Sequence, residues 1–264
     1  MTTTYETVLV TREGPVARVT INRPDKLNAI NGQVVDDLSA ALAALEAEGG
    51  VRVVEVTGAG DRAFVAGADI AAMVEMGPAE AEAFSQRGHR LTAQMAAAPF
   101  PIVAVVQGFC LGGGMELALA CDLIVAGDRA KFGQPEVGLG VIPGFGGTVR
   151  LGRRVGLGKA REMILGGGVI DAAEALRIGL ADQVHPQAEL AARASALSAQ
   201  MAAHAPRAVA LAKRVLYAGE GVPEAVASAL EVQAFALCFG TEDQKTGMRT
   251  FVSSPKAPRV FQGR

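Results

Sequence analysis

The sequence contains no tryptophan, and aromatic residues make up only 5% of its 264 residues. A surface that stacks nucleic-acid bases needs several aromatic side chains, so no such platform is expected. The formal net charge is −2 at pH 7, which gives no general attraction to nucleic acid or to an anionic membrane surface. These shortages predict a protein without nucleic-acid or membrane partners.

Cysteine is scarce as well. Cys110, Cys121 and Cys238 show neither a CxxC motif nor the Cys/His spacing of a metal site. An odd number of cysteines embedded in apolar segments is typical of buried, reduced thiols. We therefore expect no disulfide, no metal site and a cytoplasmic location.

Long uninterrupted apolar segments are also missing. The most apolar region, residues 95–127, is broken by Pro99, Pro101, Gln107, three consecutive glycines and Glu116. A membrane-spanning helix needs about 20 mostly apolar residues without such breaks. The first residues lack the basic and apolar regions of a secretory signal, so none is expected. Because 50% of the residues are hydrophobic and 20% are charged, the chain is predicted to be globular.

The pattern of apolar residues predicts an α/β fold. Strands are expected at residues 8–10, 16–22, 51–57, 101–106 and 123–126, and helices at 31–48 and 78–98. Beyond Gly146 almost every segment is predicted to be helical, with capping patterns at Asp171 and Thr241. A change in composition near Pro186 divides the chain into a core, residues 1–186, and a helical C-terminal subdomain, residues 187–264. The helices of this subdomain would pack against another subunit or fold back on the core.

Two glutamates lie in glycine-rich segments. Glu116 belongs to LGGGMELALACD (111–122), and Glu136 belongs to FGQPEVGLGVIP (132–143). The three glycines before Glu116 predict a sharp turn into a helix whose first N–H groups have no partner within the helix. A second turn, at residues 64–69, would leave the N–H of Ala68 uncrowded. Two amides from separate loops can together hold one oxyanion, such as the oxygen of a thioester.

The two carboxylates indicate acid–base chemistry. Burying a glutamate raises its pKa, and two glutamates facing one apolar pocket would divide the roles of acid and base. The alternative is structural: either glutamate would instead accept from loop amides or pair with Arg150 or Arg153. The sequence alone leaves both interpretations open.

Five segments together resemble the enoyl-CoA hydratase (crotonase) family. They are residues 22–29 (NRPDKLNA), 66–70 (AGADI), 108–122, 132–136 (FGQPE) and 142–148 (IPGFGGT), and they occur in the order typical of that family. The resemblance covers roughly residues 9–251 and implies a crotonase-like spiral of ββα units with a helical C-terminal subdomain. It also implies an acyl-CoA substrate, no metal and no cofactor beyond the coenzyme A of the substrate. The expected assembly is a homotrimer or a dimer of trimers.

The resemblance assigns roles to individual residues. Glu116 and Glu136 match the catalytic pair, and the N–H groups of Ala68 and Gly113 match the oxyanion hole. The remaining matched positions would bind substrate. Lys26, Leu27 and Ala29 would lie near the adenine and phosphates of coenzyme A, and Ala66, Asp69, Ile70 and Gly144 would also contact substrate. Gly144 matches a glycine near the catalytic water, and Gln134 matches a residue beside the glutamates. Ala71 departs from the pattern, because many relatives have a basic residue there. Lys26, or a residue of a neighbouring chain such as Lys256, would substitute for it.

The implied reaction is hydration of a short-chain trans-2-enoyl-CoA to 3-hydroxyacyl-CoA. Glu116 would take a proton from water and Glu136 would deliver one to C2, whereas related isomerases typically keep only the glutamate matching Glu136. Phe145 also resembles short-chain members. The alternatives are an isomerase, a dehydratase of a functionalised acyl-CoA and an RNA-binding relative. The last would need a lysine-rich helix, and residues 78–98 offer only Arg87, His89 and Arg90 as basic residues.

Overall fold

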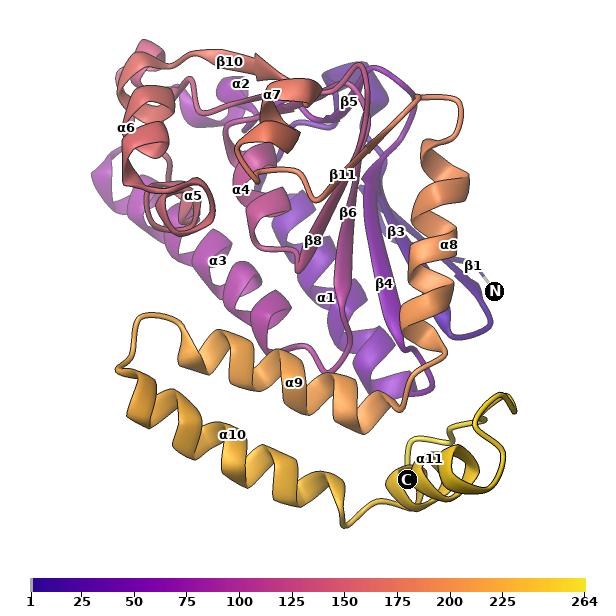
Figure 1. The fold of residues 1–264 in the computed structure, drawn as a ribbon. Coiled ribbons are helices and arrows are strands. Elements are labelled where there is room, and N and C mark those ends of the chain that lie inside the picture. Colours follow the sequence, from indigo (N-terminus) through magenta and orange to yellow (C-terminus); the bar gives the residue numbers. More distant parts are fainter. Residues whose placement is uncertain (1) are drawn as a thin grey trace.

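The structure is a computed structural model that describes residues 2–264. Two β-sheets form its centre (Figure 1). The larger sheet contains, in spatial order, β1 (Thr2–Thr4), β2 (Val8–Glu13), β3 (Val16–Ile21), β4 (Val53–Gly58), β6 (Ile102–Val106), β8 (Leu123–Gly127) and β11 (Gln183–His185). The smaller sheet contains β10 (Val169–Asp171), β9 (Lys131–Gly133), β7 (Phe109–Leu111) and β5 (Ala63–Val65).

Helices connect and cover the two sheets. They are η1 (Pro24–Lys26), α1 (Gly32–Glu48), α2 (Ile70–Met73), α3 (Pro78–Ala97), α4 (Gly113–Leu119), η2 (Glu136–Leu139), α5 (Gly147–Val155), α6 (Leu157–Gly166), α7 (Ala172–Arg177), α8 (Leu190–Ala202), α9 (Pro206–Gly219), α10 (Glu224–Cys238) and α11 (Glu242–Ser253). Three predicted helix starts are confirmed by side-chain caps. Asn31, Asp171 and Thr241 each accept a hydrogen bond from a backbone N–H three residues later.

The chain passes repeatedly from the larger sheet to the smaller one and then into a helix. The units are β4–β5 followed by α2 and α3, β6–β7 followed by α4, and β8–β9 followed by η2 and α5. Strands β5, β7 and β9 are parallel neighbours, so their carboxyl ends meet at one edge of the smaller sheet. The sequence predicted the strands at the centre of the larger sheet but none of these three short strands.

Apolar residues cover both faces of the larger sheet. Val54 and Val56 face one core together with Leu38 of α1. The alternate residue Val53 faces the other side, where it packs with Leu190 of α8. This explains why the central strands are apolar at nearly every position rather than at every second one.

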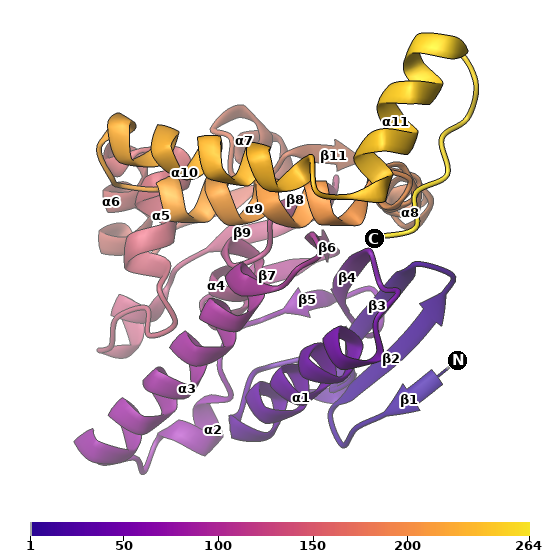
Figure 2. The ribbon, with the colours of Figure 1, turned by 90° about the horizontal axis from the view of Figure 1, so that it is seen from below.

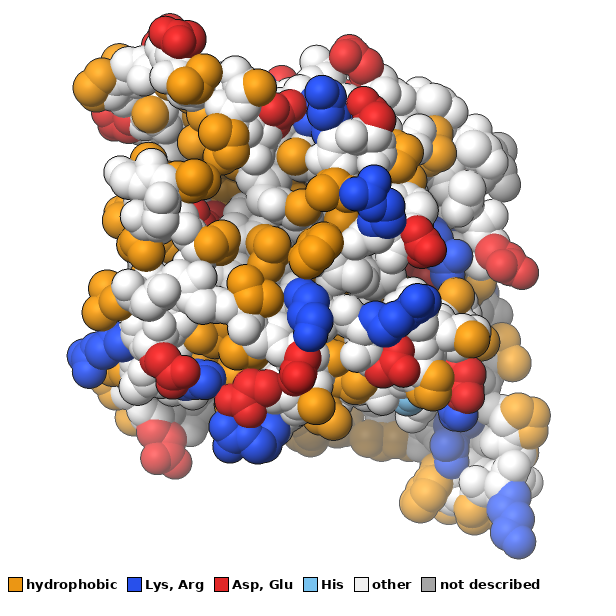
Figure 3. All heavy atoms as spheres, turned by 90° about the horizontal axis from the view of Figure 1, so that it is seen from above, with side chains coloured by type: hydrophobic (Ala, Val, Ile, Leu, Met, Phe, Trp, Pro, Cys, Tyr) orange, Lys and Arg blue, Asp and Glu red, His pale blue; other side chains and the backbone are white. Residues whose placement is uncertain are grey.

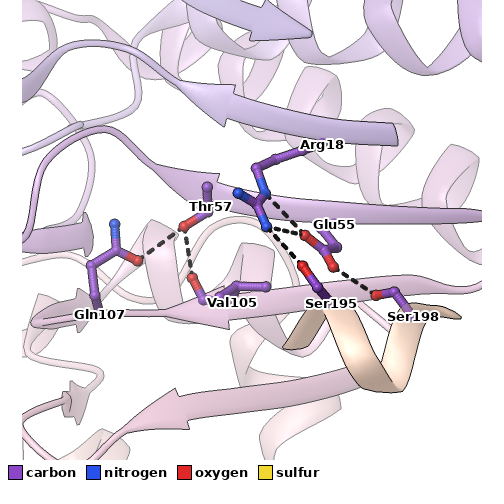
Figure 4. Close-up of polar contacts among 7 residues, drawn as sticks. All are labelled: Arg18, Glu55, Thr57, Val105, Gln107, Ser195 and Ser198. Atoms are coloured by element: carbon purple, nitrogen blue, oxygen red, sulfur yellow. Dashed lines mark hydrogen bonds and ion pairs between the residues drawn. The ribbon is translucent and has the colours of Figure 1, made fainter. Parts of the chain in front are cut away.

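One buried carboxylate helps to attach α8 to the sheet (Figure 4). Glu55 of β4 is only 1% exposed, and its Oε2 accepts from Nε and Nη2 of Arg18 on β3 at 2.9 and 2.7 Å. Its Oε1 accepts from the hydroxyl of Ser198 on α8 at 2.8 Å. The charge is thus paired and hydrogen-bonded, as a buried charge must be.

The last three helices form a layer beneath the sheets, with α10 outside α9 (Figures 1 and 2). Lys213 of α9 joins this layer to the core, since its Nζ donates to the carbonyls of Met95 and Phe100 and to Oδ2 of Asp122 at 2.8–3.0 Å. No residue of α10 is buried in this chain. The division at residues 186/187 stays a prediction. Within residues 2–264, the structure has no helix long and apolar enough to cross a bilayer.

Candidate active site

Three loops meet at the carboxyl edge of the smaller sheet. Residues 66–68 follow β5, residues 112–113 follow β7, and residues 134–136 follow β9. The backbone links two of these loops to neighbouring strands, because the N–H of Gly112 donates to the carbonyl of Gly133 at 2.9 Å. The parallel arrangement therefore brings both glutamates and both candidate amides to one place.

These loops line a cavity of about 730 Å³. The predicted residues that line it are Ala66, Ala68, Ile70, Gly113, Glu116, Glu136 and Gly144. Its other walls are mostly apolar and come from α2, α3, the end of η2 and the segment after it: Met73, Ala81, Phe84, Leu139, Val141, Ile142, Pro143 and Phe145. Figure 3 shows hydrophobic side chains gathered over part of the face seen from above, with charged side chains mostly around them. The cavity is thus an apolar space with a few polar groups in it.

The two predicted oxyanion donors are neighbours. A Cβ added to Gly113 would lie 3.7 Å from the backbone nitrogen of Ala68. Gly67 has a φ of +120° and Gly112 a φ of +51°, a backbone conformation that glycine adopts readily. Among residues 2–264, neither the N–H of Ala68 nor that of Gly113 donates to another backbone group outside the regular helices and strands. Both donors remain for a ligand oxygen.

Glu116 is held at one oxygen by a loop of the chain. Its Oε1 accepts from the N–H groups of Phe145 and Gly147, each at 2.7 Å. The structural alternative considered from the sequence is therefore realised for this one oxygen, although Glu116 also borders the cavity. Arg150 and Arg153 contact other groups, since Arg150 donates to the carbonyl of Phe145 and Arg153 pairs with Glu220. Burial raises the pKa of Glu116, and the two loop amides oppose that rise.

Gly147 is fitted closely against the two carboxylate-bearing segments. A Cβ at this position would lie 2.6 Å from the end of the Gln134 side-chain amide and 3.0 Å from Oε1 of Glu116. No side chain fits there without displacing one of them. Glycine at 147 is therefore required for the loop amides to reach Glu116.

Glu136 has a different environment. It begins η2 and is only partly buried, and burial followed by the charge of Glu116 raises its pKa to about 7. The fully buried Gln134 places its side-chain NH₂ group 2.7 and 3.0 Å from the two carboxylate oxygens, in the amide orientation that satisfies the hydrogen bonds. Two neighbouring carboxyl groups with different pKa values can divide the roles of base and acid.

The predicted coenzyme A loop lies beside the cavity rather than in its wall. The carbonyl of Leu27 accepts from the N–H of Ala66 at 3.1 Å, so this loop runs along the one that carries Ala68. Lys26, Leu27 and Ala29 do not line the cavity, and their contact with coenzyme A stays a prediction. Asp69 also lies outside the lining, and its carboxylate pairs with Arg23 at 2.8 Å. The hydrogen bond from Arg23 lowers the pKa of Asp69.

Sequence reasoning missed the contribution of α3. Ala81, Ser85 and His89 occur at intervals of four, so they share one face of this helix, and all three line the cavity. The hydroxyl of Ser85 donates to the carbonyl of Gly144 at 2.5 Å. The spacing was visible in the sequence, but nothing there indicated which face of α3 turns toward the glutamates.

The cysteines take no part in this site. Cys110 and Cys121 are fully buried, and burial raises the pKa of both thiols. Within the described residues, no group of three or more His, Cys, Asp or Glu side chains is arranged to hold a metal ion.

Solved structures share this architecture. An enoyl-CoA hydratase from Bacillus anthracis matches with a TM-score of 0.94 and 32% identity, over 98% of this chain and 100% of that one. A second, from Geobacillus kaustophilus, matches with a TM-score of 0.96 and 32% identity, over 100% of this chain and 99% of the other. These similarities confirm the expected crotonase-like fold.

Sequence comparisons agree. The chain is 43% identical to a short-chain-enoyl-CoA hydratase of Clostridium acetobutylicum over 249 residues, which are 94% of this chain and 95% of the relative. It is 42% identical to a crotonyl-CoA hydratase of Syntrophomonas wolfei over 255 residues, 96% and 97% of the two chains. A sequence model described as enoyl-CoA hydratase/isomerase matches residues 11–262. The chain therefore belongs to the enoyl-CoA hydratase/isomerase family of enzymes.

Proposed function

We propose that this protein adds water across the double bond of a short-chain trans-2-enoyl-CoA to give the 3-hydroxyacyl-CoA. The observation that carries the proposal is the meeting of two differently held glutamates and two free N–H groups in one apolar cavity. The names of the relatives from Clostridium and Syntrophomonas support this choice of reaction.

In the proposed mechanism, the thioester oxygen binds to the N–H groups of Ala68 and Gly113. Negative charge develops on this oxygen as water attacks C3, and the fixed donors stabilise it without reorganising. Removal of one donor of this kind typically costs about 2.7–4 kcal/mol of transition-state stabilisation. The oxyanion hole is therefore expected to stabilise the transition state by about as much as a catalytic carboxylate does.

The two glutamates move the protons. Ionised Glu116 takes a proton from the attacking water, and protonated Glu136 delivers a proton to C2. The N–H groups of Phe145 and Gly147 hold Oε1 of Glu116, and we call this pair of hydrogen bonds the clamp. The clamp fixes the direction of the second oxygen and favours the ionised carboxylate of Glu116. A pKa of about 7 for Glu136 suits a group that must lose a proton and regain it near neutral pH.

The substrate carries its own coenzyme A, so the proposed reaction requires no further cofactor and no metal. We also propose that the chain works as a homotrimer or a dimer of trimers in the cytoplasm. Light scattering coupled to size-exclusion chromatography would measure the assembly directly. A monomeric and fully active protein would contradict that part of the proposal.

The activity is tested with crotonyl-CoA and purified protein. We expect the ultraviolet absorbance of the conjugated thioester to fall and 3-hydroxybutyryl-CoA to accumulate. Unchanged absorbance would contradict the proposal. Appearance of the conjugated band from a 3-enoyl-CoA, without hydration of crotonyl-CoA, would identify an isomerase instead.

A further inference from the structure

The loop that holds Glu116, residues 144–148, is rich in glycine. Gly144, Gly146 and Gly147 surround Phe145, and Gly146 has a φ of +103°. Because glycine populates more backbone conformations than other residues, a segment of this composition has little stiffness of its own. The peptide group between residues 144 and 145 can therefore rotate and turn its N–H away from the glutamate unless another part of the chain fixes it.

A hydroxyl group on α3 holds this peptide group at its carbonyl end. The Oγ–H of Ser85 donates to the carbonyl of Gly144 at 2.5 Å. The N–H of the same peptide group belongs to Phe145 and donates to Oε1 of Glu116 at 2.7 Å. The carbonyl and the N–H of a trans peptide group point in opposite directions, so a donor fixed at the carbonyl aims the N–H. Hydrogen bonds connected in this way also strengthen one another.

Helix α3 lies close against the loop, so that Ser85 can reach it. Gly88, one turn further along, is buried, and a Cβ there would lie 2.2 Å from the ring of Phe145. A serine hydroxyl inside a helix commonly bonds to a carbonyl of its own helix or to water, whereas the hydroxyl of Ser85 crosses to another segment. Arg150 joins the next carbonyl of the loop, that of Phe145, to the hydroxyl of Thr92 on α3, with both distances 2.8 Å. The two anchors fix successive peptide groups of the loop.

We propose that Ser85 is a positioning residue for Glu116, because its hydroxyl fixes the peptide group between Gly144 and Phe145 whose N–H holds Oε1 of the glutamate. This inference rests on the proposed function, in which Glu116 is the base. Ser85 acts through the peptide group and needs no contact with the reacting atoms. It supports one of the two hydrogen bonds of the clamp, and the bond from Gly147 remains when the hydroxyl is lost.

Ser85→Ala removes this donor and leaves the charges around Glu116 in place. They include Arg150 on α5, Glu136 at the start of η2 and the titratable His89, which borders the same cavity from α3. Hydrogen bonds to a carboxylate favour its ionised form, so the pKa of Glu116 should rise when the loop N–H turns away.

Two changes in the kinetics of Ser85→Ala are expected. The low-pH limb of kcat/KM for crotonyl-CoA should move to higher pH. At neutral pH, kcat should fall by about three- to tenfold, as is typical for the loss of one neutral hydrogen bond. The affinity for butanoyl-CoA should stay at the wild-type value, because the effect of Ser85 falls on the base and not on the bound substrate.

Two further variants separate positioning from a structural role. Ser85→Thr keeps a hydroxyl at this position and should restore both the limb and kcat. Ser39→Ala is the matched control, because the hydroxyl of Ser39 on α1 donates to the side-chain amide of Gln94 on α3 at 2.5 Å, and neither residue lines the cavity. This control should leave the limb at its wild-type pH.

Three results would overturn the proposal. The first is a low-pH limb that stays at the wild-type pH in Ser85→Ala or moves equally in Ser39→Ala. The second is a limb in Ser85→Thr at the same pH as in Ser85→Ala. The third is a loss confined to the affinity for butanoyl-CoA, which would show that Ser85 lines the cavity without positioning the base.

Infrared titration of Glu116 separates this proposal from the proposed function. The carboxylate bands of the wild-type protein and of Ser85→Ala, assigned by difference against Glu116→Gln, give the pKa of Glu116 without any turnover. If the wild-type protein does not hydrate crotonyl-CoA but this pKa is higher in Ser85→Ala, the hydratase proposal fails and the role of Ser85 stands. If hydration occurs and the pKa is the same in both proteins, the role of Ser85 is overturned and the hydratase proposal stands.

Discussion

Glu116 and Glu136 share a cavity but differ in what surrounds their oxygens. Glu116 is 2% exposed and is clamped by two backbone N–H groups. Glu136 is more exposed, begins a short helix and is contacted by the amide of Gln134. The clamp favours an ionised Glu116, and the negative charge of Glu116 favours a protonated Glu136. This asymmetry supports the proposal that Glu116 is the base and Glu136 the acid.

The pH dependence of hydration follows from these environments. Since the proposed mechanism requires a protonated Glu136 and its pKa is about 7, kcat/KM should fall as pH rises above this value. At low pH it should fall again as Glu116 is protonated, beginning above the ordinary value of 4.5 because burial raises the pKa of Glu116. The two pKa values obtained from this pH profile describe the interacting pair of glutamates rather than either residue alone. A value of kcat/KM that keeps rising to pH 9 would contradict the assignment of Glu136 as the acid.

A methyl group at Gly147 should damage the same clamp. In Gly147→Ala the new Cβ meets Gln134 and Glu116 at 2.6 and 3.0 Å, so the loop must move and its amides leave Glu116. We expect kcat/KM to fall by about 10²-fold or more, the low end of what acid–base catalysis contributes. Gly138→Ala is the matched control, because nothing lies within 4 Å of a Cβ at that position. Equal activity of the two variants would show that the clamp is dispensable.

At the scale of elements, the sequence predicted five of the seven strands of the larger sheet, all but β1 and β11, and missed the strands that position the site. Strands β5, β7 and β9 each contain three residues, too few to show an alternating pattern. Their parallel pairing is formed between segments far apart in the chain and leaves no local signal. The clamp on Glu116 was also hidden, because its donors are backbone N–H groups. Only the glycines at 146 and 147 hinted at it.

The glutamates and glycine turns were nevertheless identifiable from residue type alone. A carboxylate at position 116 inside an apolar helix and three consecutive glycines before it are unusual in a buried segment. What sequence reasoning lacked was the distance between the loops. It therefore left the structural and catalytic interpretations of Glu116 open. The structure shows that loop amides hold Oε1 and that Glu116 also borders the cavity.

The attachment of α8 to the larger sheet can be tested through Arg18. Arg18→Met leaves the buried carboxylate of Glu55 without its cation, and we expect a loss of about 2–3 kcal/mol, less than a fully buried pair would lose because Arg18 is partly exposed. Arg18→Met/Glu55→Leu should recover most of this stability, since no charge then remains buried. The control Arg193→Met breaks an exposed pair with Glu189 and should change stability little. Urea denaturation measures all three, and equal effects of Arg18→Met and Arg193→Met would contradict the account.

At the scale of the whole molecule, one buried cation helps to join the C-terminal layer to the core. Lys213 lies on α9 and is 6% exposed. Helix α10 packs against α9. The cavity, in contrast, is lined entirely by residues 66–148. Loss of the contact between the layers should therefore reduce stability and assembly before it reaches the geometry of the glutamates.

Lys213→Met tests this separation. It removes the cation that pairs with Asp122 and the Nζ donor of two carbonyls, while Asp122 keeps the N–H of Ile102. We expect a loss of about 3–5 kcal/mol in unfolding free energy and faster proteolysis within residues 206–264. The control Lys245→Met removes a lysine from an exposed ion pair with Glu242 and should change stability by less than about 0.5 kcal/mol. Resistance of Lys213→Met to protease, equal to that of the control, would show that other contacts hold the layer.

The most direct measurement of the central claim is the rate of crotonyl-CoA hydration by Glu116→Gln, by Glu136→Gln and by the wild-type protein. We predict that each substitution lowers kcat/KM by about 10²- to 10⁴-fold, the contribution expected of a positioned acid or base, while binding of butanoyl-CoA persists. Near wild-type hydration by either variant would remove that glutamate from the mechanism and contradict the account.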